Sequence, residues 1–149
     1  MTTVYAESSA VLAWLLGEST QDTVRDALAQ ADAVVTSALT GIECGRGLRR
    51  ARLGRRITMS QEASAIRLLD EALAGWHVMD LTDEIVAAAR GTFPREPVRT
   101  LDALHLASAI VLQQALGALD VLSFDERVRA NAATLQMTVV PAMPEGGGA

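Results

Sequence analysis

The fold of this chain is decided by the stretch Thr3-Val4-Tyr5-Ala6-Glu7-Ser8-Ser9-Ala10. Its first four residues predict a short buried strand. An acid, Glu7, follows directly, and the two serines after it are suited to cap a helix that starts near Ala10. A strand that turns directly into a helix is the first part of a βαβ unit. The stretch therefore predicts an α/β fold with Glu7 at the carboxyl end of a strand.

The alternation of strand and helix continues along the chain of 149 residues. Further strands are predicted at 33–36, 76–79, 121–123 and 138–140. Helices are predicted at 10–16, 21–31, 38–53, 60–73, 84–90, 101–116 and 126–134. This order is typical of a three-layer α/β/α sandwich with a mostly parallel sheet of about five strands. We expect a single domain over 1–141 and a disordered tail over 142–149, which is rich in Pro and Gly.

Composition excludes several classes of protein. All 13 basic residues are arginine, whereas P-loop NTPases, protein kinases and Schiff-base enzymes need a lysine. The one cysteine, Cys44, allows no intramolecular disulfide and no cysteine-based zinc site, and we expect it in the core. The net charge of −5 argues against a general nucleic-acid coat protein but leaves a local basic patch open. Because no apolar run approaches the ~20 residues of a membrane span and the start, Met1-Thr2-Thr3, lacks the features of a secretory leader, we expect a cytoplasmic protein.

Four acids stand at positions that a parallel sheet would bring to one edge. Glu7 and Asp125 follow predicted strands, Glu43 lies about two turns into the helix after the second strand, and Asp102 lies in the first turn of its helix. Ligands of such sheets bind beyond the carboxyl ends of the strands. A cluster of carboxylates binds a hard divalent cation, and such a cation commonly serves phosphate chemistry.

Each acid also has a purely structural interpretation. Asp102 suits the positive end of its helix, and Asp125 suits the cap of the next one. Glu7 could be a surface acid, and Glu43 could pair with Arg46, three residues further along the helix. The joint occurrence of all four favours a shared metal site.

Other polar residues are expected to support this site or the core. Ser9 and Ser123 are interpreted as hydrogen-bonding partners of site carboxylates or backbone. His105 is interpreted as a packing residue of its helix and not as a metal ligand. Asp120 is either a fifth acid near the site or a turn residue, and we favour the turn.

The chain has one basic cluster, at 46–56. A solvated helix surface is one interpretation. A stripe that binds phosphate groups beside Glu43 is the other. The residues assigned to that stripe are Arg46, Arg49, Arg50 and Arg52.

These motifs together resemble the PIN domain family. Residues 5–10, Tyr-Ala-Glu-Ser-Ser-Ala, are similar to its opening strand, which usually reads Asp-Thr-Ser-Ala. Residues 37–43 resemble the segment of its second acid, 101–107 its Asp-Ala-x-x-x-Ala helix, and 122–125 its Thr/Ser-x-Asp motif. The order matches over about residues 3–140. A small PIN domain of this kind resembles the VapC-type toxin of VapBC toxin–antitoxin modules.

The resemblance implies an endoribonuclease that cuts RNA with Mg²⁺ or Mn²⁺. Glu7, Glu43, Asp102 and Asp125 would be its catalytic and metal-binding residues. It also implies a homodimer and a cognate VapB-type antitoxin. Glu7 stands where the family usually has Asp, which leaves open a weakly active or inactive PIN-fold module that binds RNA or a protein partner. A metal-dependent phosphatase is a third candidate, but the region of Glu7 lacks a nucleophilic Asp motif.

Overall fold

A computed structural model describes residues 1–142, and the predicted disordered tail from residue 143 on lies outside them. The strands are β1 (Thr3–Ala6), β2 (Ala33–Ser37), β3 (His77–Met79), β4 (Asp120–Leu122) and β5 (Thr138–Val140). The helices are α1 (Ser8–Leu15), α2 (Gln21–Gln30), α3 (Ala38–Leu53), α4 (Met59–Gly75), α5 (Asp83–Ala89), α6 (Thr100–Leu116) and α7 (Glu126–Thr134).

The five strands form one parallel sheet in the order β3-β2-β1-β4-β5. The predicted fold class is therefore confirmed. The chain first builds the sheet outward from β1 to β3, and then returns to the other side of β1 to add β4 and β5. The strand order thus reverses between β1 and β4, which is where open α/β sheets bind their ligands.

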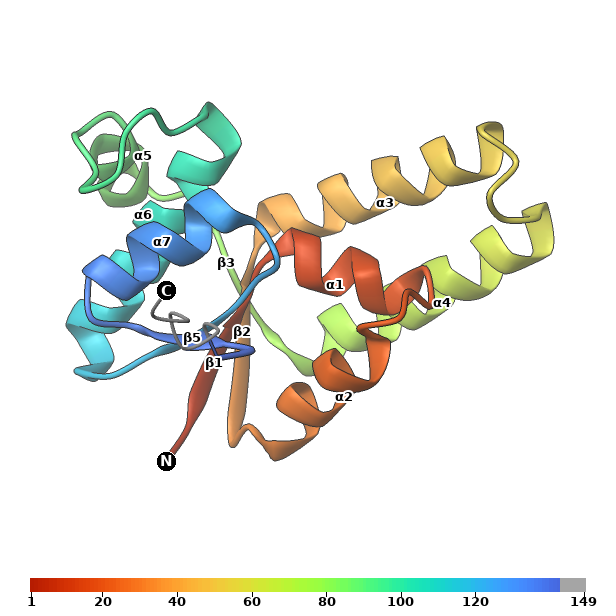
Figure 1. The fold of residues 1–149 in the computed structure, drawn as a ribbon, viewed down its shortest axis with the longest axis horizontal. Coiled ribbons are helices and arrows are strands. Elements are labelled where there is room, and N and C mark those ends of the chain that lie inside the picture. The colour runs from red at the N-terminus through yellow and green to blue at the C-terminus, as the bar shows by residue number, and fades with distance from the viewer. Residues whose placement is uncertain (143–149) are drawn as a thin grey trace, which may run out of the picture.

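Helices cover both faces of the sheet. In Figure 1, α5, α6 and α7 lie on one side, and α1, α2, α3 and α4 lie on the other. Successive residues of a strand point to opposite faces. Accordingly, Tyr5 packs with Leu106 of α6 and Val128 of α7, while Ala6 packs with Leu48 of α3 and Cys44, which is buried as predicted.

Several helix ends differ from the predictions by one or two residues. Helix α1 begins at Ser8, so its N-cap residue is Glu7 and not one of the predicted serines. Helix α4 starts at Met59 and not at Ser60, because Thr58 and Gln61 form a reciprocal capping box. Gly54 ends α3 as predicted but with an ordinary φ of −79°. The left-handed residue is the next one, Arg55, with φ 60°.

Asp120 is the first residue of β4 and not a turn residue. It pairs with Val4 on one side and Thr138 on the other. It lies at the amino end of its strand, whereas the four acids line a pocket at the carboxyl edge of the sheet. Burial raises the pKa of its carboxyl group. Asp120 is therefore part of the sheet and not a fifth acid of the site.

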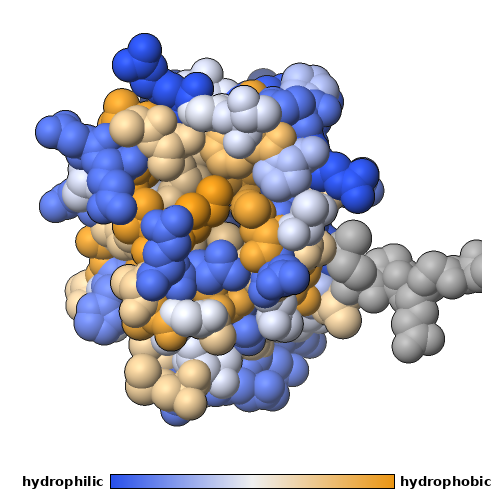
Figure 2. All heavy atoms as spheres, turned by 90° about the vertical axis from the view of Figure 1, so that its left-hand side faces the viewer, coloured by the Kyte–Doolittle hydropathy of each residue, from blue (hydrophilic) through white to orange (hydrophobic). Residues whose placement is uncertain are grey.

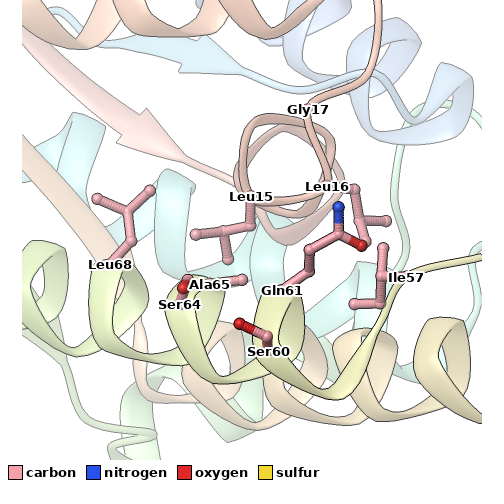
Figure 3. Close-up of a pocket in the computed structure, with 9 residues that line it drawn as sticks. All are labelled: Leu15, Leu16, Gly17, Ile57, Ser60, Gln61, Ser64, Ala65 and Leu68. Atoms are coloured by element: carbon pink, nitrogen blue, oxygen red, sulfur yellow. The ribbon is translucent and has the colours of Figure 1, made fainter.

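The surface carries two apolar features outside the acid edge. Figure 2 shows hydrophobic atoms gathered across the middle of the face that α5, α6 and α7 cover. A groove of about 430 Å³ between α5 and the start of α6 includes Leu81 and Val86, whose side chains are 37% and 43% exposed. A second pocket lies where the end of α1 meets the start of α4 (Figure 3). Within residues 1–142, no helix has the length and apolarity needed to cross a membrane.

Candidate active site

A pocket of about 480 Å³ lies at the carboxyl edge of the sheet. It is lined by all four predicted acids, Glu7, Glu43, Asp102 and Asp125. By contrast, the pocket between α1 and α4 in Figure 3 has no ionisable side chain in its lining. The pocket with the acids is therefore the candidate for chemistry.

Glu7 is fixed at the junction of β1 and α1. Its backbone N–H donates to the Leu122 carbonyl at 3.0 Å, which ties this junction to the end of β4. Its side chain is buried, and Oε2 accepts hydrogen bonds from the hydroxyls of Ser123, at 2.7 Å, and Ser9. The prediction that these two serines hold a site carboxylate is confirmed.

Glu43 is held by donors from two other helices. Its Oε1 accepts a hydrogen bond from the Ser8 hydroxyl at 2.9 Å and lies 2.6 Å from His105 Nε2. Burial acts to raise the pKa of Glu43, but the hydrogen bond and positive charge of His105, together with the hydrogen bond from Ser8, outweigh it and keep the pKa below its ordinary value. Within residues 1–142, Glu43 makes no ion pair with Arg46.

Asp125 and Asp102 lie at the starts of α7 and α6. Asp125 Oδ1 accepts from the backbone N–H groups of Arg127 and Val128, each at 3.0 Å, so it caps α7 as its structural interpretation predicted. Asp102 lies in the first turn of α6. Burial, and then the negative charges of Asp125 and Glu7, raise the pKa of Asp102.

The hydrogen bonds leave carboxylate oxygens available to the pocket. Glu7, Glu43 and Asp125 each use one oxygen for the protein donors described above, and Asp102 has no side-chain hydrogen bond or ion pair within residues 1–142. No buried side-chain oxygen of this part of the chain lacks a partner. The unpaired carboxylate oxygens are therefore accessible.

This donor set fits an open cation site and not a closed cage. Anionic oxygens are the ligands that Mg²⁺ and Mn²⁺ prefer. In the described part of the chain, no three His, Cys, Asp or Glu side chains are already grouped to hold a metal ion. Mg²⁺ commonly binds through one or two carboxylates and keeps water or substrate phosphate as its other ligands. The pocket suits that mode of binding.

His105 is the site residue that the sequence prediction missed. It was expected to pack within its own helix, but its ring contacts Tyr5 of β1, Ser8 of α1 and Glu43 of α3. The available signal was its spacing from Asp102. Residues three apart on a helix share a face, so the two side chains point toward the same region.

The arginine cluster separates into residues with different surroundings. Arg46 and Arg50 line the pocket with the acids, and Arg49 is exposed outside its lining. The Nε of Arg52 lies 2.8 Å from Glu62 Oε2, so Arg52 pairs α3 with α4 and is turned away from the pocket. Its assignment to the RNA-binding stripe is not supported by this geometry.

Comparisons with known proteins agree with this architecture. The chain is 33% identical to Ribonuclease VapC46 of Mycobacterium tuberculosis over 140 residues. The matched region covers 94% of this chain and 98% of that protein. Ribonuclease VapC35 of the same species is 26% identical over 139 residues, covering 92% and 95% of the two chains.

Two solved structures share the fold at low sequence identity. The M. tuberculosis sarcin–ricin-loop-cleaving toxin VapC20 has a TM-score of 0.58 at 17% identity, covering 85% of this chain and 93% of that one. FitAB bound to an IR36 DNA fragment has a TM-score of 0.66 at 13% identity, covering 97% and 99%. The model of the PIN domain matches residues 4–135. With its parallel sheet, its acid-lined pocket and this match, the chain belongs to the PIN domain family.

Proposed function

We propose that this protein is a metal-dependent endoribonuclease, the toxin component of a type II toxin–antitoxin module. The observation that carries the proposal is the convergence of four acids on one pocket with accessible, unpaired carboxylate oxygens. The similarity to relatives named ribonucleases over nearly the whole chain supports the same reaction class.

Mutual repulsion of the acids supports a cation as their partner. Burial, and then the charges of Asp125 and Glu7, raise the pKa of Asp102. Like charges gathered in a partly buried pocket disfavour one another, and a bound cation relieves this. We propose that Glu7, Glu43, Asp102 and Asp125 hold Mg²⁺ or Mn²⁺.

The side chains of the site would have different roles in phosphodiester hydrolysis. A divalent cation bound here would supply activation of water and neutralisation of charge at the scissile phosphate. Glu7, Glu43 and Asp125 are oriented by their hydrogen bonds and would present their remaining oxygens to the pocket. Asp102, which has no hydrogen-bonding partner in the described chain, is the carboxylate best placed to accept a proton from the attacking water.

Arg46 and Arg50 are the residues that we propose for the RNA backbone. Both are exposed and line the pocket beside the acids. A guanidinium group pairs with phosphate through two parallel hydrogen bonds. This arrangement gives an acidic protein a local attraction for RNA.

We further propose a homodimer and a cognate VapB-type antitoxin as partners. The apolar groove between α5 and α6 is the surface that we assign to the second copy, because exposed apolar side chains on a polar surface mark protein contacts. Val86→Asp should reduce the mass measured by light scattering to that of one chain. Leu116→Asp, on an exposed apolar residue outside the groove, is the control and should leave the mass unchanged.

The test of the enzyme function is cleavage of RNA by purified Asp102→Asn with Mg²⁺ or Mn²⁺ present. An amide cannot supply the anionic oxygen that these ions prefer, so the variant should fold normally and lose nearly all cleavage. If the variant cleaved RNA as well as the wild type does, the role of Asp102 would be limited to stabilising the N-terminus of its helix. No cleavage by the unmutated protein with either metal would instead favour a PIN-fold binding module.

A second test addresses the arginines. Replacing Arg46 and Arg50 by Gln should lower the slope of log affinity against log salt by about 0.7 for each lost contact with single-stranded RNA. Arg49→Gln is the matched control from the same helix, outside the pocket lining, and should change the slope less. An unchanged slope in the double variant would remove both arginines from RNA binding.

A further inference from the structure

A chain of buried polar groups runs from the sheet to Glu43. The Tyr5 hydroxyl lies 2.8 Å from His105 Nδ1, and His105 Nε2 lies 2.6 Å from Glu43 Oε1. The Ser8 hydroxyl closes the group at 2.9 Å from the same carboxylate oxygen. Tyr5, Ser8 and His105 are 0%, 5% and 1% exposed. These contacts join β1, α1, α3 and α6 at one point beneath the pocket.

The hydrogen-bond directions in this chain follow from the chemistry of its members. An ionised carboxylate only accepts, so the Nε2 of His105 must carry the proton that faces Glu43. Nδ1 accepts from the Tyr5 hydroxyl when the ring is neutral and donates to the Tyr5 oxygen when the ring is protonated, so the imidazole is held at both nitrogens in either state. The rings of Tyr5 and His105 meet edge to face, with centroids 6.0 Å apart, so packing also fixes the imidazole.

Glu43 needs such support more than the other acids. Asp125 is held by the backbone of its own helix, and Glu7 by serines near the strand ends. Glu43 has a longer side chain, extends from the middle of α3, and has no donor on that helix. Without His105 and Ser8, its carboxylate would be free to turn away from the pocket.

We propose that Tyr5, Ser8 and His105 form a positioning relay that holds the Glu43 carboxylate in one orientation and so sets the metal affinity and turnover of the site. This inference rests on the proposed metal-dependent nuclease function. Oε1 of Glu43 is occupied by the relay, which leaves Oε2 to face the pocket. Tyr5 and His105 are positioning residues, because the structure gives them no place in the pocket lining.

The binding experiment compares Mn²⁺ affinity by calorimetry for wild type, His105→Leu and His105→Gln. His105→Leu removes the donor to Glu43, whereas the amide of His105→Gln can still donate. Loss of a residue that orients a metal ligand typically costs about 10–100-fold in metal affinity or activity. We expect that loss in His105→Leu and a substantial recovery in His105→Gln.

The control separates positioning from general core stability. Val24 of α2 is fully buried in a core cluster that contains no member of the relay, so Val24→Ala destabilises the core without touching the relay. Below its unfolding transition this variant should bind Mn²⁺ as the wild type does. In RNA cleavage, His105→Leu should lower kcat with little change in KM, because RNA binding does not use the relay. Equal Mn²⁺ affinity in wild type and His105→Leu, or equal losses in His105→Leu and Val24→Ala, would overturn the proposal.

A spectroscopic reading tests the relay without metal or substrate. In ¹⁵N NMR of the metal-free protein, His105 should show a protonated Nε2 and a hydrogen-bonded Nδ1. Tyr5→Phe should shift the Nδ1 signal and leave Nε2 protonated. A ring that averages between tautomers in the wild type would refute the relay. Failure of the wild type to bind Mn²⁺ or to cut RNA, with the fixed tautomer present, would instead refute the nuclease function and limit the relay to orienting Glu43.

Discussion

Gly47 lies where α3 passes α1, and replacing it tests how closely the two helices that carry the site are held. A Cβ added there would lie 2.7 Å from Leu12 Cδ2 and 3.0 Å from Cδ1. Ordinary carbon contacts are about 3.5–4.0 Å. A Cβ added at Gly45, two residues earlier in α3, would have nothing within 4 Å. The two positions therefore differ in crowding but share a helix.

The expected magnitudes follow from two opposing effects. Ala in place of Gly inside a helix gains roughly 0.5–1 kcal/mol at either position. Overpacking costs roughly 1–3 kcal/mol and applies only at Gly47. Gly45→Ala should therefore raise the free energy of unfolding by roughly 0.5–1 kcal/mol, and Gly47→Ala should lower it by about 0–2.5 kcal/mol. The difference between the variants, about 1–3 kcal/mol, is independent of helix propensity, which cancels.

Urea unfolding followed by circular dichroism measures both variants under one condition. Their m-values should be equal, so that a shift in midpoint reports stability. Leu12 lines the pocket, so its displacement by Gly47→Ala should also weaken RNA cleavage, whereas Gly45→Ala should not. Equal stabilisation by the two substitutions would refute the reasoning, because it would mean that Leu12 moves aside at no cost.

Three further outcomes are expected. Arg52→Gln should lower the free energy of unfolding, measured in urea, by about 1.5–3 kcal/mol, because it removes a charged hydrogen bond from the buried Glu62. The same variant should leave the salt dependence of RNA binding, measured by titration, unchanged. Glu7→Asp should keep or raise RNA cleavage and Glu7→Gln should lose most of it, whereas full activity in both would show that this side chain is not a ligand. Cys44 should resist a thiol reagent at pH 8 until the protein unfolds, because burial raises the pKa of its thiol to about 12; rapid labelling of the native protein would contradict its placement in the core.

The parts of the fold that were predicted correctly depend on local patterns. Helix α7 and strand β5 have the predicted bounds, because caps and alternating residues mark their ends. The start of α4 was misplaced because Ser60 and Thr58 are both acceptable caps by residue type. Only the reciprocal bond with Gln61 decides between them, and it is a property of the folded geometry.

The acids of the site could be predicted from the sequence, but the residues that orient them could not. Glu7 and Asp125 follow strand ends, Asp102 lies in the first turn of α6 and Glu43 lies about two turns into α3, and these positions can be read from the sequence. His105 looked like a core residue because its partners Tyr5 and Glu43 are 100 and 62 residues away. Likewise, the helical spacing of Arg52 gives its direction on α3 but not the acid that it meets on α4.

The return of the chain to β1 has a consequence for synthesis of the protein. Glu7 leaves the ribosome before its hydrogen-bonding partners, because Ser123 and the backbone of Leu122 come 116 and 115 residues later. Asp125 follows still later, so a growing chain has no complete pocket until β4 and the start of α7 have emerged. Because long-range pairings of this kind form slowly, the unfinished chain would lack a competent site while it is still being made. A cognate antitoxin would have that interval in which to bind before the site becomes competent.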